Sequence, residues 1–518
     1  MQHLEPLLQI DRHKAALTRS ALSKPVRSAL EAGLFTPTST FFDYGCGHGG
    51  DIQRMNEQGF TSSGWDPHYR PHTEPHPADI INLGYIINVI EDPNERRTAL
   101  VNAWSLTNKL LIVAAQVLID DRIRGEILYN DGIITRINTF QKNYQQQELK
   151  TYIDQILNVD AIPVALGIYF IFRDDTHAET FRASRYRSRT TTPRIRPSIR
   201  RFEEYREILT PLMDFVTDRG RLPLNIETQD FQDLQTQFGT LHRAFQILLQ
   251  ATDRQEWDTI ADKRRHDILI YLALTHFTDR PRLRDLPLAL QNDIKGLFGS
   301  YPQACTTADL MLFNLGTPGV IAACCQKSTI GRLTDTGLLV HISALSALDP
   351  MLRMYEACAS RTIGRMDSTT LIKIHLHQPK ISYLDYPDFD RVAHPPLRTR
   401  MQIDLRDLHV SYRDYDPNDN PPILHWKDHY ILEDYPQHHK FAKLTQQETH
   451  WGLLDRPKAI THQNVWKQCL EEHCAELKGH RILWQKDADP YQIKLIKSAQ
   501  RKRNPKSPLP PIVPLQDR

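Results

Sequence analysis

The sequence predicts an α/β domain built on a parallel sheet, followed by an all-α middle domain and an α+β C-terminal domain. In the first third of the chain, strand-like apolar runs alternate with helical segments. The middle has apolar residues three and four positions apart, which is the helical period. After about residue 371, apolar residues recur at every second position, as in half-buried strands. A chain of 518 residues has room for three to four such domains.

Changes in composition place the domain boundaries. We expect an α/β domain over residues 1–178, an Arg- and Pro-rich linker over 179–206, a helical domain over 207–346, an α+β domain over 347–480 and a basic, Pro-rich tail over 481–518.

Charge and cysteine content narrow the class of protein. The net charge is only +2, so contact with nucleic acid requires a local basic patch. Seven scattered cysteines do not form a disulfide framework, which indicates a reducing compartment. The N-terminus has no signal-peptide pattern, and no apolar run is long enough to cross a bilayer. We therefore expect a cytoplasmic protein.

The elements of the first domain follow from apolar runs and their breakers. Residues 13–33 have helical spacing with a new first turn near Ser23, because Pro25 interrupts the helix, and Gly33 ends it. Strands are expected at 40–42, from Ala78 and from Lys109, with a crossover helix at 93–104 and a closing antiparallel pair around Gly167.

A glycine-rich turn, FFDYGCGHGGDIQRM, follows the first of these strands. Glycines allow a tight turn and let a bulky cofactor approach the backbone closely. The spacing of Gly45, Gly47 and Gly50 also satisfies the dinucleotide fingerprint, so the loop alone supports two cofactors. Asp43, just before the loop, favours a cationic group such as the amino-acid part of S-adenosylmethionine. Asp66, nineteen residues after Gly47, ends a second strand and is placed to accept hydrogen bonds from ribose hydroxyls.

These motifs carry a resemblance to a known family. Through FDYGCGHG, GWDP and ADIINLGYIINVIED, residues 35–175 resemble class I S-adenosylmethionine-dependent methyltransferases, which have a Rossmann-like domain. Over most of its length the chain more closely resembles the DNA phosphorothioation-associated methyltransferases, through LSKPVRSALEAGL, RRHDILIYLAL, KIHLHQPKISYLDYPDFD and NPPILHWKD. The resemblance implies a bacterial protein encoded beside DNA sulfur-modification enzymes. Together with the motifs, it assigns the cofactor contacts to Asp43, Gly45, Cys46, Gly47, Asp66, Pro67 and Gly84.

The chain departs from the general methyltransferase pattern after Asp66. Asp79 follows only 13 positions later, which is too short for the usual further helix and strand. We therefore expect a shortened sheet. Contacts to the adenine ring normally come from the missing segment, which leaves His68 and Tyr69 as stand-in candidates.

The candidate catalytic residues follow the strand that starts at Ala78. In this fold the reacting centre lies at the carboxyl ends of the strands. Tyr85 and Asn88 could position an acceptor, and Glu91 could be a base. Equally, Tyr85 could form a wall of the cofactor pocket, and Asn88 and Glu91 could be turn or helix-start residues.

Three other chemistries find less support. The segment Asn420-Pro421-Pro422-Ile423 resembles an amino-methylation loop, but it lacks the aromatic fourth residue and a proline-rich turn explains it. Methylation of a cytosine carbon needs a cysteine after the strand, and none occurs there. Cys469, His473 and Cys474 lie near one another without a C-x-x-C pair, so we expect no metal.

An Arg-rich stretch follows the first domain and is the best candidate for phosphate contact. A solvated linker explains it equally well. The residues proposed to contact nucleic acid are Arg185, Arg187, Arg189, Arg194 and Arg196.

The sequence thus predicts an S-adenosylmethionine-dependent methyltransferase with DNA, or a DNA-linked molecule, as the expected acceptor. One alternative is methylation of a small molecule or a protein. The other is a non-catalytic cofactor-binding subunit of a defence complex. The sequence does not fix the oligomeric state.

Overall fold

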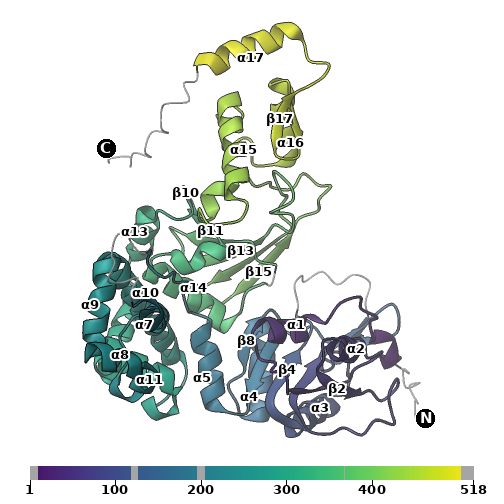
Figure 1. Ribbon diagram of the computed structural model, residues 1–518. Helices are drawn as coiled ribbons and strands as arrows, with labels where there is room; N and C mark the ends of the chain where they lie inside the picture. Colours follow the sequence, from purple (N-terminus) through teal and green to yellow (C-terminus); the bar gives the residue numbers. More distant parts are fainter. Residues whose placement is uncertain (1–9, 118–126, 195–204, 367, 503–518) are drawn as a thin grey trace, which may run out of the picture. The chain divides into compact units, whose positions relative to one another are not determined.

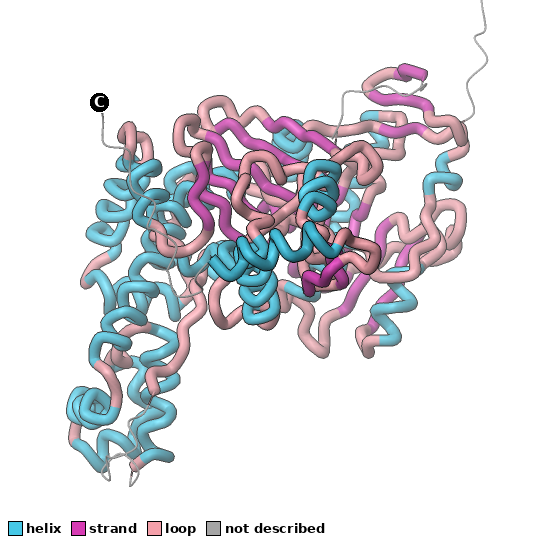
Figure 2. The backbone as a smooth tube through the Cα atoms, turned by 90° about the horizontal axis from the view of Figure 1, so that it is seen from above, coloured by secondary structure: helices cyan, strands magenta, loops and turns pink. Residues whose placement is uncertain are grey.

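A computed structural model of the chain describes residues 10–117, 127–194, 205–366 and 368–502. The chain divides into two compact units, and each consists of two segments of the sequence. Unit 1 comprises Met1–Ile321 and Asp349–Asp367, and unit 2 comprises Ala322–Leu348 and Ser368–Arg518. Figure 2 shows the strands of each sheet as neighbouring magenta tubes.

Unit 1 contains a six-stranded sheet with the order β2-β1-β3-β4-β9-β8 (Figure 1). The first four strands pair in parallel, and β9 is antiparallel to both β4 and β8. The predicted α/β class and the closing antiparallel pair at the sheet edge are therefore confirmed. The strands are β1 (Thr40–Tyr44), β2 (Thr61–Trp65), β3 (Ala78–Gly84), β4 (Thr107–Ala114), β8 (Ile162–Ala165) and β9 (Ile168–Phe172).

Helices cover both faces of this sheet. Apolar residues of α3 and α4 pack on one face, and those of α1, α2 and α5 pack on the other. Helix α1 begins directly after Ser23 and has Pro25 in its first turn, as predicted. The helices are α1 (Lys24–Glu31), α2 (Gly50–Glu57), α3 (Pro93–Ser105), α4 (Gln146–Leu157) and α5 (Asp175–Ser184), with a 3-10 turn η1 (Arg12–Ala15) before them.

As predicted, the sheet has no further strand from the residues between Asp66 and Asp79. β2 is an edge strand, and residues 66–77 form turns and one isolated bridge between Asp66 and Arg70. A small separate sheet follows β4 along the chain. Its strands are β5 (Ile127–Tyr129), β6 (Gly132–Ile134) and β7 (Phe140–Gln141).

The rest of unit 1 is helical, as the apolar period predicted. Leu234, Leu241 and Leu248 are buried in its core. The elements are α7 (Arg206–Arg219), η2 (Asn225–Phe231), α8 (Gln232–Phe238), α9 (Leu241–Ala251), α10 (Arg254–Leu274), η3 (Thr275–Phe277), η4 (Leu283–Asp285), α11 (Leu288–Phe298), α12 (Tyr301–Asn314) and α14 (Pro350–Thr362). Helix α13 (Val320–Lys327) crosses the division between the units.

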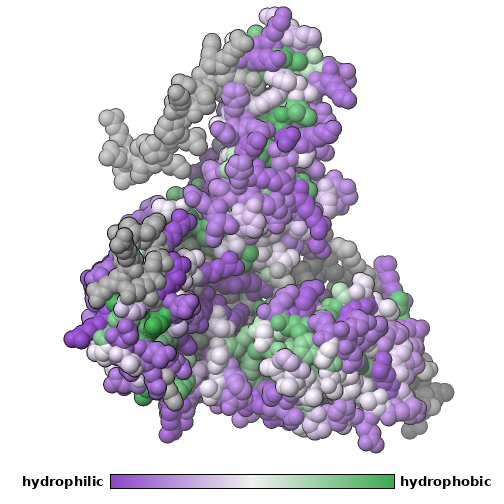
Figure 3. Space-filling view, in the orientation of Figure 1, coloured by the Kyte–Doolittle hydropathy of each residue, from purple (hydrophilic) through white to green (hydrophobic). Residues whose placement is uncertain are grey.

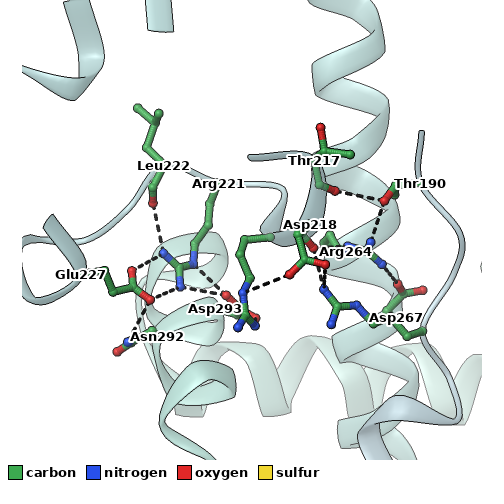
Figure 4. A network of polar contacts seen from close by, with 12 residues as sticks. Thr190, Thr217, Asp218, Arg221, Leu222, Glu227, Arg264, Asp267, Asn292 and Asp293 are labelled. Atoms are coloured by element: carbon green, nitrogen blue, oxygen red, sulfur yellow. Dashed lines mark hydrogen bonds and ion pairs between the residues drawn. The ribbon is translucent and has the colours of Figure 1, made fainter. Parts of the chain in front are cut away.

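A buried arginine ties the segment after α5 to these helices (Figure 4). Arg264 on α10 donates to the Asp218 carbonyl, to Thr190 Oγ1 and to the Asp267 carboxylate. Asp267 also accepts from the backbone and hydroxyl of Ser188. Part of the expected linker is thus packed into unit 1.

Unit 2 holds a six-stranded antiparallel sheet with the order β10-β11-β12-β13-β14-β15. Its strands are β10 (Arg332–Thr334), β11 (Gly337–His341), β12 (Leu371–His375), β13 (Lys380–Asp385), β14 (Thr399–Asp404) and β15 (Val410–Asp414). The first two strands precede the expected boundary at 347, whereas α14 follows it and belongs to unit 1. This difference arises because β11 pairs with β12 across the helix that lies between them in sequence.

The remaining elements of unit 2 are mostly helices. They are η5 (Ile342–Ala347), η6 (Lys427–Tyr430), α15 (His438–Trp451) and α16 (Gln463–Glu472), then the hairpin of β16 (Ala475–Lys478) and β17 (Arg481–Trp484), and finally α17 (Pro490–Lys502). The expected tail therefore begins inside a hairpin and includes a helix. Residues 503–518, which carry most of its prolines, lie outside the described residues.

Two further expectations concern the whole chain. None of the helices in the described segments combines the length and the apolar character needed to span a bilayer. The face drawn in Figure 3 is mostly hydrophilic. All seven cysteines are free thiols, as expected without a disulfide framework.

Candidate functional site

A cavity of about 300 Å³ lies at the carboxyl ends of β1 and β3 in unit 1. This is the position at which open parallel sheets bind ligands. Every predicted cofactor-contacting residue lines this cavity, which we call the loop pocket. Those residues are Asp43, Gly45, Cys46, Gly47, Asp66, Pro67 and Gly84.

Two glycines of the loop, Gly45 and Gly47, have backbone angles that favour glycine, and one of them also has little room for a side chain. Gly45 has a φ of +85°, and a Cβ there would lie 2.4 Å from Cδ1 of Ile86. Gly47 has a φ of +51°. An L-residue with a side chain rarely adopts these angles. The loop therefore depends on glycine before any ligand is considered.

Asp43 is a buried carboxylate at the end of β1. Asn82 Nδ2, on the neighbouring strand β3, donates to Asp43 Oδ1 at 2.8 Å. Burial raises the pKa of Asp43 to about 7, and the nearby Asp51 adds to this shift. A carboxyl group held in this way gains stability in its ionised form from any cation placed in the pocket.

Asp66 organises the opposite side of the loop pocket. Its Oδ2 accepts from the Gly47 backbone N–H at 3.0 Å, and its Oδ1 accepts from the backbone N–H groups of His68 and Tyr69 at 2.9 Å. His68 and Tyr69, the stand-in candidates for adenine contacts, also line the pocket. Cys46 lines it as well, and burial raises the pKa of its thiol to about 12, so it stays protonated.

The N-terminal segment lies along the same pocket. Arg12 donates two hydrogen bonds of 2.7 Å to the Glu91 carboxylate and two more, of 2.6 and 2.7 Å, to Glu95. The hydroxyl of Tyr69 donates to the His13 carbonyl at 3.0 Å. Residues 12–19, which contribute several lining residues, are thus held by contacts with α3 and with the turn after β2.

A second cavity, of about 890 Å³, shares Arg19, Ser23 and Tyr85 with the loop pocket. We call it the basic cavity, because cationic residues line it and no Asp or Glu does so among the described residues. Its positive charge favours an anionic ligand. The cationic residues are Lys14, Arg19, Lys24, Arg27 and Arg136.

The three predicted catalytic residues lie in different surroundings. Tyr85 lines both cavities, has a φ of +64°, and has the Arg19 guanidinium 5.5 Å from its ring centre. Asn88 lines the basic cavity. Glu91 lines neither, since Arg12 engages its carboxylate. Burial alone would raise the pKa of Glu91, but the hydrogen bonds from Arg12 outweigh it and the pKa is lowered. A paired carboxylate of low pKa makes a weak base.

Buried polar atoms without partners collect around the two cavities. Ser23 Oγ, Asn82 Oδ1 and Asn88 Oδ1 have no hydrogen bond among the described residues, although the three side chains are at most 4% exposed. Leaving such an atom unpaired costs free energy. All three residues line one or both cavities, so a bound ligand can supply the missing hydrogen bonds.

Comparison with known proteins gives structural likenesses only. No family model matches the chain, and no curated protein matches it. A 1,6-didemethyltoxoflavin N1-methyltransferase from Burkholderia thailandensis is similar at 11% identity, over 29% of this chain and 75% of that one, with a TM-score of 0.23.

Two other solved structures are similar over a comparable share of the chain. An S-adenosylmethionine-dependent methyltransferase from Clostridium acetobutylicum has 10% identity over 31% of this chain and 93% of its own, with a TM-score of 0.22. An amino pentose methyltransferase from Micromonospora echinaspora has 9% identity over 30% of this chain and all of its own, with a TM-score of 0.20.

Two of the arginines predicted to contact nucleic acid make hydrogen bonds within unit 1, and one of these two, Arg187, is exposed. Arg185 donates to the Pro163 carbonyl, and Arg187 donates to the carbonyl and the carboxylate of Asp218. Arg189 and Arg194 are exposed. Arg196 lies outside the described residues.

Sequence reasoning missed the residues that enclose the site. Arg12 and Arg19 precede the motifs and form part of a segment with no recognisable signature. Asp51 and Asn82 lie within expected elements, but their positions beside Asp43 arise only when β1, β3 and α2 assemble. The signal that could have singled out Asn82 is its polar side chain in the buried strand ADIINLG.

The pairing of Arg12 with Glu91 and Glu95 gives a testable role for the N-terminal segment. Arg12→Ala removes four hydrogen bonds, so the backbone amides of residues 11–22 should exchange with solvent several-fold faster. Hydrogen exchange measured by mass spectrometry checks this.

Lys14→Ala is the matched control, since Lys14 makes a local contact with Asp11 in an exposed pair. Its exchange should match that of the unmodified protein. Equal exchange in Arg12→Ala and the unmodified protein would show that the ion pairs do not hold the segment.

Proposed function

We propose that unit 1 binds S-adenosylmethionine in the loop pocket and transfers its methyl group to an anionic acceptor held in the basic cavity. The observation that carries this proposal is the buried Asp43 at the inner end of the loop pocket. A dinucleotide would bring a negatively charged pyrophosphate to the glycine loop, where Asp43 and Asp51 would repel it. S-adenosylmethionine instead offers an ammonium and a sulfonium group.

The remaining residues of the loop pocket suit the other parts of this cofactor. Asp66 has lone pairs beyond those its three backbone contacts use, and it can accept from ribose hydroxyls. The orphan Oδ1 of Asn82 can accept from the ammonium group. The rings of His68 and Tyr69 provide apolar surface for a nucleobase.

Methyl transfer is an in-line displacement, so the chain's main task is alignment of the acceptor atom with the sulfonium methyl. Tyr85 lies between the two cavities and can orient an acceptor there. Burial raises the pKa of its hydroxyl, which therefore remains a hydrogen-bond donor. Asn88 offers an unpaired acceptor atom from the basic cavity. With Glu91 paired to Arg12, we assign no base to this step.

The charge of the basic cavity supports an acceptor that carries phosphate. Five cationic residues line it, and guanidinium groups bind phosphate oxygens well. DNA or a DNA-linked molecule fits this chemistry, and the resemblance to the phosphorothioation-associated family favours the same acceptor. A bacterial DNA-modification role is therefore our proposal for the chain.

Cofactor binding tests the first half of this proposal. Asp66→Ala should weaken binding of S-adenosylmethionine by about 1 to 3 kcal/mol, through loss of hydrogen bonds to a charged group. Isothermal titration calorimetry measures the change. Glu74→Ala removes an exposed carboxylate from the same turn region and should leave the affinity unaltered. Unchanged affinity in Asp66→Ala would remove Asp66 from the ribose role.

Transfer of the methyl group to DNA tests the second part of the proposal, which concerns the acceptor. With tritiated cofactor, label should enter DNA, and Arg136→Ala should raise the KM for DNA several-fold while cofactor affinity stays the same. The log of DNA affinity should also fall less steeply with the log of salt concentration in Arg136→Ala than in the unmodified protein. The slope should differ by about one unit for each phosphate contact that is lost.

Arg97→Ala is the matched control, because Arg97 is an exposed arginine of α3 outside both cavities. Label in proteins or metabolites of a fractionated lysate, with none in DNA, would favour a different acceptor. Cofactor binding without transfer to any fraction would favour a non-catalytic binding subunit.

A further inference from the structure

Three buried side chains of unit 2 meet in the core beneath α15. They are His394, His425 and Glu448, which are 7%, 4% and 0% exposed. One potential ligand atom from each lies within 4.8 Å of the others. The three residues come from the connection between β13 and β14, from the segment before η6 and from α15 itself.

Four polar atoms of this cluster are left without hydrogen bonds. Neither carboxylate oxygen of Glu448 has a hydrogen-bond partner among the described residues, and nor does Nδ1 of His425 or of His394. His394 Nε2 and Glu448 Oε1 lie 2.6 Å apart, the separation of an ion pair. Burying polar atoms without hydrogen bonds costs free energy, so a further partner for this cluster is favoured.

The tautomer of His425 is set for metal binding. Its Nε2 lies 2.8 Å from the Ile460 carbonyl, which can only accept, so this nitrogen carries the proton. Nδ1 is left with a free lone pair inside the cluster. Metal-bound histidines commonly donate their other ring N–H to a backbone carbonyl in this way.

We propose that His394, His425 and Glu448 bind one divalent transition-metal ion, for which Zn²⁺ is the best candidate. Two imidazole nitrogens and a carboxylate form a common zinc ligand set and leave one position for water. Two charged side chains lie near the cluster: Asp428, which accepts from Thr445 Oγ1 at 2.6 Å, and Lys427, which donates to the Phe389 and Val392 carbonyls at 2.7 and 2.6 Å.

The surroundings indicate a structural ion. The ring of Trp466 on α16 packs against both histidines, with centroid distances of 4.5 and 4.7 Å. Ile423, Leu444 and Ile460 belong to the same buried cluster as Trp466. The ion therefore joins two irregular segments to α15 without access for a substrate. The expectation of no metal concerned Cys469, His473 and Cys474, whereas this cluster joins residues that are far apart in the sequence.

Metal content of the full-length protein tests this proposal. After incubation with Zn²⁺ and removal of the excess ion, elemental mass spectrometry should find about one zinc ion per chain. Glu448→Gln keeps the shape of the side chain but loses its charge, and zinc affinity should fall by at least about tenfold. A chelator should lower the Tm of the unmodified protein but leave that of Glu448→Gln unaltered.

The double variant Cys469→Ser, His473→Gln is the matched control, because Cys469 Sγ on α16 and Nδ1 of His473, directly after α16, lie only 3.9 Å apart and form a thiol–imidazole pair that could bind zinc instead. It should retain zinc. The proposal is overturned if the folded, unmodified protein takes up no zinc, or if Glu448→Gln binds zinc as tightly as the unmodified protein. Loss of zinc in the double variant alone would overturn it as well.

Discussion

The geometry of the loop pocket depends on one buried carboxylate. Asp43 lies buried near the end of β1, where it accepts a hydrogen bond from the uncharged amide of Asn82 on the adjacent strand. Asp51 lies near enough to raise its pKa further. An arrangement of this kind is costly for a folded protein unless a cation offsets it. The glycine loop, the turn at Asp66 and the N-terminal segment surround the space that such a cation would enter.

The two cavities of unit 1 have opposite electrostatic character and share a wall. The loop pocket has acidic groups at its inner end, whereas the basic cavity is lined by lysine and arginine. Tyr85 and Arg19 line both cavities and form part of the wall between them. A cationic methyl donor and an anionic acceptor would therefore each be drawn to a different cavity and meet at Tyr85. This division of charge links the sheet's topology to the proposed reaction.

The sequence predicted features that depend on short stretches of chain. The buried strands, the glycine loop and the first turn of α1 at Pro25 all have local causes, and the structure has them where expected. Features that join distant residues were missed. Arg12 pairs with Glu91 across 79 positions, β11 pairs with β12 across α14, and His394, His425 and Glu448 meet from three segments. No period or motif encodes such contacts, because each arises from tertiary packing.

The pH dependence of cofactor affinity tests the role of Asp43 most directly. Since the pKa of Asp43 is raised to about 7, protons compete with a cationic ligand below that pH. Between pH 6 and 8, the affinity for S-adenosylmethionine should rise by roughly tenfold, as one ionisation linked to binding requires. The Asp43→Asn variant, measured over the same pH range, controls for the ligand's own ionisation. Its affinity for S-adenosylmethionine should not show this rise. The same pH profile in both proteins, or binding of a dinucleotide in place of S-adenosylmethionine, would contradict the account.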